Sequence, residues 1–102
     1  MIISLLHNHY SPEHLEEVKA EMIKRGAPRI RAIWNEGCGE WKAVEGCHRI
    51  RAAHALGLTP IIVDITNQER VRVQDDGESV RKGVKRLAQE LEDNWQAVGF
   101  TF

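Results

Sequence analysis

The segment EGCHR, residues 45–49, places a carboxylate, a thiol, an imidazole and a guanidinium around one glycine. It leads into a predicted helix, and a helix N-terminus, with unpaired N–H groups and partial positive charge, favours anions over cations. A bound phosphate would resolve this conflict, because Gly46 would let it approach the backbone and Arg49 would grip its oxygens in a fork. We therefore expect a phosphate-binding loop made of Gly46, Cys47, His48 and Arg49.

Three side chains of this segment suit catalysis, although each also has a structural interpretation. The positive helix end favours the Cys47 thiolate as a nucleophile, or Cys47 is simply a small residue in a tight turn. His48 can contact phosphate or transfer a proton near neutral pH, or it can bond within the turn. Glu45 can hold a phosphate-bound Mg²⁺, act as a general base, or pair with Arg49. The candidate catalytic residues are Glu45, Cys47 and His48, and the candidate metal ligand is Glu45.

Weaker signals surround this segment. Arg51 is expected to be solvated. His7 and His9 would share one side of a strand and could join the cysteines in a zinc site, but their spacing matches no structural zinc framework. Trp34 and Trp41 flank a predicted turn, where they either cover a bound base or pack in the core.

Capping and turn residues divide the first part of the chain into short elements. Ser11 and Pro12 form a helix start and Gly26 a stop, and Gly57 ends the helix that begins at Gly46. Alternating and β-branched runs indicate strands around these helices. The predicted elements are an opening strand at 2–6, a helix at about 12–25, a hairpin of strands 28–34 and 41–45, a helix at 46–56 and a buried strand at 60–65.

One periodic segment dominates the last part of the chain. Its apolar residues recur at helical steps of three and four, and they are Val80, Val84, Leu87, Leu91 and Trp95. This spacing predicts a helix over 78–98 with one apolar face, through which a homodimer could form. Before it we expect a short strand at 70–74 and a turn at residues 75–77.

The bulk composition is that of a small globular protein. The chain has 102 residues, which favours a single domain over 1–102, and the order of its elements favours an α/β (α+β) fold with a small mixed sheet. A net charge of −1 provides no broad basic field for nucleic acid or acidic lipid, so an anion site must be local. With no signal-like or membrane-spanning run, we expect a cytoplasmic protein with reduced cysteines and no membrane partner.

Residues 44–65, VEGCHRIRAAHALGLTPIIVDI, resemble the signature of the ParB/sulfiredoxin superfamily, in which a G-x-x-R-x-x-A-A helix precedes a Gly-Leu turn and an apolar strand. The matching positions are Gly46, Arg49, Ala52, Ala53, Gly57 and Leu58. A similar helix–Gly–strand pattern extends the resemblance to residues 10–65, and residues 46–49 are identical to the G-C-H-R of sulfiredoxins. The resemblance implies a nucleotide-phosphate cradle at residues 46–49.

Several activities are implied by this resemblance. Binding of a nucleotide, ATP or CTP with Mg²⁺, is the function we expect, and phosphoryl transfer or nucleotide hydrolysis would be its enzymatic forms. One alternative is a sulfiredoxin-like thiol enzyme that uses Cys47. Another is a DNA-binding or nuclease module, whose nucleic-acid contacts would be weak and made through the arginines between Arg25 and Arg51. A fourth is a non-catalytic interaction domain that dimerises.

Overall fold

The computed structural model describes residues 1–5, 9–75, 78–93 and 98–102. Three expectations fall outside these residues: the contribution of His7 to a zinc site, the turn at Asp76 and Gly77, and the place of Trp95 on a helix face.

Five strands form a mixed sheet in the order β4-β2-β3-β1-β7. Their bounds are Ile2–Leu5 for β1, Arg29–Asn35 for β2, Glu40–Ala43 for β3, Ile61–Asp64 for β4 and Val98–Thr101 for β7. The pairs β1–β3 and β2–β4 are parallel, whereas β2–β3 and β1–β7 are antiparallel. The predicted α+β class and mixed sheet are therefore confirmed.

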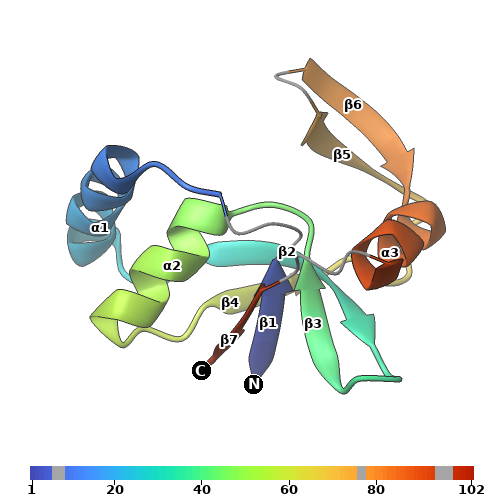
Figure 1. Ribbon diagram of the computed structural model, residues 1–102, viewed down its shortest axis with the longest axis horizontal. Coiled ribbons are helices and arrows are strands. Elements are labelled where there is room, and N and C mark those ends of the chain that lie inside the picture. Colours follow the sequence, from blue (N-terminus) through green and yellow to red (C-terminus); the bar gives the residue numbers. More distant parts are fainter. Residues whose placement is uncertain (6–8, 76–77, 94–97) are drawn as a thin grey trace.

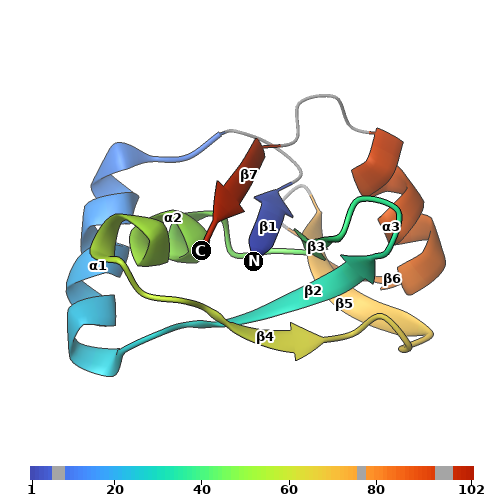
Figure 2. The ribbon, with the colours of Figure 1, turned by 90° about the horizontal axis from the view of Figure 1, so that it is seen from below.

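The helices and a second, two-stranded sheet cover both faces of this sheet. Helix α2 (Cys47–Leu56) lies on one face, and helix α1 (Pro12–Arg25) packs on the outer side of α2. On the opposite side lie helix α3 (Val84–Asp93) and the antiparallel pair of β5 (Arg70–Asp75) and β6 (Glu78–Gly83). Figures 1 and 2 show the resulting order of layers: α1, α2, the sheet, then α3 with β5 and β6.

Helix α2 is buried from two directions. Ile50 is fully buried against the sheet, where Ile3, Ile30 and Ala43 belong to the same cluster. Ala52 and Ala53 belong instead to a cluster with Met22 of α1. Small side chains let two helices approach closely, so the alanine pair accounts for the tight stacking of α1 on α2.

A separate apolar cluster joins the opposite face of the sheet to α3 and to the β5–β6 pair. Its buried members are Ile33, Ile65, Val71, Val73, Val84, Leu87 and Leu91. The three residues of α3 in this cluster are those that the helical periodicity identified. Because the protein's own core buries these three residues, the described part of α3 offers no free apolar stripe for the expected homodimer.

The predicted helix over 78–98 is wrong at both ends. Residues Glu78–Gly83 form β6, the helix covers Val84–Asp93 among the described residues, and residues from Val98 form β7. Val80 satisfies two periodicities: it is four residues before Val84, and it also lies opposite Val73 across the β5–β6 ladder. Pairing with β5 therefore decides the conformation of this segment.

The strand predicted at 60–65 differs from expectation, because β4 itself has no fully buried residue, although Ile65 directly after it is buried. β4 pairs only with β2 and forms an edge of the sheet, and the Ile61 side chain is 51% exposed. A β-branched run satisfies an edge strand as well as a central one, so its apolar character does not report its place in the sheet.

We expect Gly46→Ala to destabilise the protein more than Gly57→Ala. Both glycines have positive φ, +96° and +70°, and a Cβ there costs about 1–2 kcal/mol. At Gly46 the added Cβ would also lie 3.0 Å from Ile30 Cδ1, whereas at Gly57 nothing lies within 4 Å. Overpacking should add about 1 kcal/mol or more at Gly46 alone. Urea unfolding of the two variants measures the difference, and equal losses would contradict a tight approach of Ile30.

Asp64 is expected to contribute stability that acid removes. Its carboxylate accepts hydrogen bonds from the hydroxyl and the N–H of Thr66, and these bonds hold the pKa of Asp64 below its ordinary value of 3.8. Because the unfolded chain then binds the proton more readily, the contribution is present above pH 3.8 and is lost as pH falls through the folded pKa. Unfolding of Asp64→Asn should show a smaller loss of stability between pH 5 and 2.5 than wild type; an identical pH profile would refute this assignment.

Candidate functional site

The start of α2 lies against the chain segment that precedes α1. The Cys47 thiol donates to the His9 carbonyl over 3.2 Å, and the Ser11 N–H donates to His48 Nε2 over 3.0 Å. The His14 ring packs edge-on against the His48 ring, with centroids 4.5 Å apart. Two of the three candidate catalytic side chains therefore hold the start of α1 against the start of α2.

The hydrogen bond to His48 also determines which of its ring nitrogens carries the proton. Since Nε2 accepts a hydrogen bond from a backbone N–H, it carries no proton, and in the neutral ring the proton resides on Nδ1. Acid–base catalysis through Nε2 would require this contact to break.

Glu45 is held by two arginines. Its Oε1 lies 2.7 Å from Arg31 Nη2 and 3.8 Å from Arg49 Nη2, and Arg49 Nη1 donates to the Arg29 carbonyl over 2.8 Å. The expected pair of Glu45 with Arg49 is present, but Arg31 is the closer partner. Sequence reasoning missed Arg31, because its contact with Glu45 arises from strand pairing: the Val44 N–H bonds to the Arg31 carbonyl.

Arg51 does not point into solvent as expected. Its guanidinium carbon lies 4.2 Å from the centroid of the Tyr10 ring and 5.2 Å from that of Phe100. Both distances are typical of cation–π interactions, so Arg51 joins the segment before α1 to β7. The sequence analysis did not indicate this contact, because it predicted no strand at Val98–Thr101.

A groove of about 640 Å³ opens beside Arg49. Its apolar lining comes from Val18 and Met22 of α1 and from the turn that contains Pro28, and Arg29 and Arg49 line it from the start of β2 and from α2. The predicted loop thus contributes Arg49 to the groove, whereas Glu45, Gly46, Cys47 and His48 do not line it. Helix α1 was missed as part of the site, because its packing on α2 is a tertiary contact.

Charges around the groove are unevenly neutralised. Arg25 Nε lies 3.2 Å from the Glu21 carboxylate, and His14 Nδ1 lies 3.4 Å from that of Glu17. Arg29 makes no ion pair with any residue that the structure describes. The lining therefore holds Glu17 and Glu21 beside Arg25, Arg29 and Arg49, and its surplus of one positive charge lies with Arg29 and Arg49.

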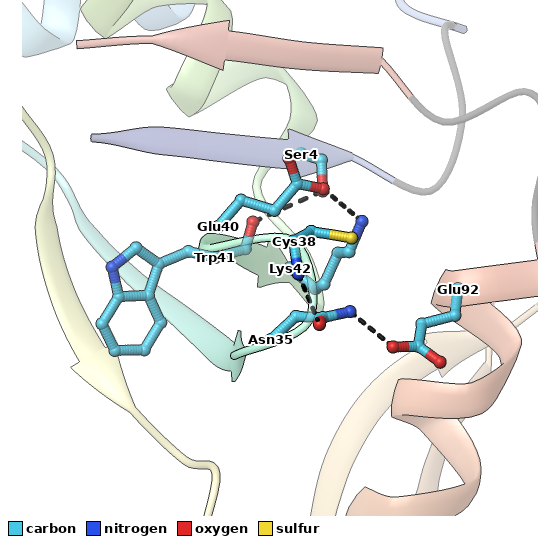
Figure 3. Close-up of polar contacts among 7 residues, drawn as sticks. All are labelled: Ser4, Asn35, Cys38, Glu40, Trp41, Lys42 and Glu92. Atoms are coloured by element: carbon cyan, nitrogen blue, oxygen red, sulfur yellow. Dashed lines mark hydrogen bonds and ion pairs between the residues drawn. The ribbon is translucent and has the colours of Figure 1, made fainter.

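A second polar cluster lies under the β2–β3 hairpin (Figure 3). Lys42, only 8% exposed, forms an ion pair with Glu40, and the Ser4 hydroxyl lies 3.3 Å from Glu40 Oε1. Asn35 donates to Glu92 of α3 over 2.6 Å. These contacts join the hairpin to β1 and α3.

The structure also addresses the other features that the sequence analysis considered, namely a zinc site, the two tryptophans and a membrane-spanning segment. Within residues 1–5, 9–75, 78–93 and 98–102, no three His, Cys, Asp or Glu side chains gather closely enough to hold a metal ion. Trp34 and Trp41 pack edge-on against each other, with ring centroids 5.0 Å apart. No helix in the described part of the chain is both long enough and apolar enough to cross a membrane.

We expect Cys38 to react with a thiol reagent several-fold faster than Cys47. Both are free cysteines, but Cys38 is exposed in the hairpin turn, whereas the half-buried Cys47 thiol donates to a carbonyl. Timed labelling of Cys47→Ser and Cys38→Ser measures each thiol separately. Faster labelling of Cys47 would instead indicate the activated nucleophile that the thiol-enzyme alternative requires.

Comparison with known proteins adds no relative. No protein-family model, curated protein or solved structure matches the chain. The resemblance of residues 10–65 to the ParB/sulfiredoxin superfamily therefore stays a prediction.

Proposed function

We propose that this protein binds a nucleotide, ATP or CTP, in the groove between α1 and Arg49. The observation that supports this proposal is the combination of an apolar lining with two arginines, Arg29 and Arg49, in one concavity. Its volume of about 640 Å³ lies within the range of about 300–1,000 Å³ for small-molecule sites. The base and sugar would contact Val18, Met22 and Pro28, and the phosphates would contact the arginines.

Arg49 is the phosphate anchor in this proposal, because its ion pair with Glu45 is weak and phosphate would replace that contact together with the hydrogen bond from Nη1 to the Arg29 carbonyl. Its guanidinium is 3.8 Å from Glu45, its side chain is 40% exposed, and exposed ion pairs contribute only about 0–1 kcal/mol. Glu45 would keep Arg31 as its partner when Arg49 turns away. A bidentate arginine–phosphate contact is stronger than the interaction it would replace.

The approach to Gly46 depends on the same movement. A Cβ at Gly46 would lie 3.4 Å from Arg49 Nη2, so the Arg49 side chain covers this glycine. Phosphate would reach the backbone of the loop only after Arg49 turns outward.

Magnesium does not fit Glu45 in this arrangement. The Glu45 Oε1 atom faces two guanidinium groups, and these would repel a divalent cation at that oxygen. The proposal therefore concerns nucleotide binding without a Mg²⁺ ligand from Glu45. Catalysis by Cys47 or His48 is left out of it, since both side chains hold the segment before α1.

Calorimetric titration with ATP and CTP tests the anchor. Arg49→Ala should weaken binding by about 10- to 150-fold, which corresponds to the 1.5–3 kcal/mol of a hydrogen bond to a charged group. Arg86→Ala is the matched control, because Arg86 also forms an i,i+4 pair with a glutamate but lies on α3. Equal affinity of Arg49→Ala and wild type, or no binding by wild type, would refute the proposal.

Glu45→Gln should strengthen nucleotide binding several-fold without Mg²⁺, because it releases Arg49 from its carboxylate partner. The same titration is repeated with Mg²⁺. If Glu45 were a metal ligand, the variant would instead bind more weakly, and only in the presence of the metal.

A further inference from the structure

The two-stranded ribbon of β5 and β6 has two chemically different faces. Val71 and Val73 of β5 are buried in the core, and Val80 of β6 packs against the same cluster. Because side chains alternate along a strand, the neighbouring residues Arg70, Arg72 and Arg81 share the opposite face, and all three are exposed. Figure 1 shows this ribbon projecting from the body of the protein beside α3.

The three arginines of this outer face have no carboxylate partner among the residues that the structure describes. None of them forms an ion pair with a residue that the structure describes; Arg72 donates only to the Ser79 hydroxyl, over 3.2 Å. The nearby cations Lys82 and Arg86 differ, since both pair with Glu90. The outer face therefore holds positive charge that no ion pair with a described residue neutralises.

Strand register makes this arrangement costly in the free protein. Arg72 and Arg81 are direct cross-strand partners, and like charges in that position destabilise a sheet. At the base of the ribbon, Arg70 and Arg81 also line one concavity of about 520 Å³ with Gln68 and Glu69. A bound polyanion would remove the repulsion between the arginines.

The side chains on the outer face of the ribbon favour one class of polyanion over the others. A protein partner would be expected to meet an apolar centre, but the apolar valines of the ribbon face the core. Single-stranded nucleic acid is bound by stacking on aromatic rings, and neither strand contains an aromatic residue. Phosphates of a duplex require only exposed cationic side chains such as these arginines.

We infer that the outer face of the β5–β6 ribbon, defined by Arg70, Arg72 and Arg81, binds the phosphate backbone of duplex nucleic acid. The arginines contact phosphates and no bases, so binding is independent of sequence. This site is separate from the nucleotide groove and involves none of its arginines.

Fluorescence anisotropy with a 20-base-pair DNA duplex, titrated at several salt concentrations, tests the inference. Wild type should bind with a dissociation constant of about 10⁻⁴–10⁻⁶ M and a slope of log K against log salt of about −2.7, for three phosphate contacts. Arg72→Ala/Arg81→Ala should reduce the slope to about −0.9. Its melting temperature should equal or exceed that of wild type, because the cross-strand repulsion is removed.

Matched variants test where the duplex binds, and competitors test which chemical group is recognised. Arg25→Ala/Arg86→Ala removes two exposed arginines elsewhere and should bind as wild type; equal loss in this control would overturn the ribbon as the site. Arg72→Lys/Arg81→Lys retains the charge and should retain the slope.

Displacement of the duplex by poly-glutamate of equal charge, or tighter binding of single-stranded DNA, would overturn the assignment to duplex phosphates. A nucleotide titration of Arg72→Ala/Arg81→Ala should match wild type, which separates this site from the groove.

Discussion

Burial of α2 from two sides is the constraint on which the arrangement of this protein depends. Ile50 faces the sheet and Ala52 and Ala53 face α1, so the helix cannot rotate about its axis without exposing one apolar surface. The directions in which the polar side chains of its first two turns project are therefore fixed. His48 meets the segment before α1, and Arg49 meets the end of β3 and the start of β2.

The basic side chains at the start of α2 thus have partners within the protein. A helix N-terminus disfavours positive charge, and the unfavourable placement is offset here by contacts that join α2 to its neighbours. His48 and Arg51 hold the segment before α1, and Arg51 reaches β7 as well. Arg49 differs, because it also lines the groove and its ion pair is long. Its position links the architecture of the loop to the proposed binding of phosphate.

A net charge of −1 conceals two local concentrations of positive charge. One is the groove between α1 and α2, where apolar lining accompanies Arg29 and Arg49. The other is the outer face of the β5–β6 ribbon, which is polar. The two surfaces differ in shape and lining, so they suit ligands of different size.

The sequence by itself determined the elements whose signals are local. Helix α1 begins and ends where its capping residues and Gly26 predicted, and α2 likewise ends at Gly57, because cap geometry is set by a few adjacent residues. It also identified residues 45–49 as the chemically unusual segment. Only the tertiary structure decided what those side chains contact, that α1 forms one wall of the groove, and that residues 78–83 pair with β5. Contacts between elements depend on strand register and helix packing, and the periodicity of residues within one segment reports neither of them.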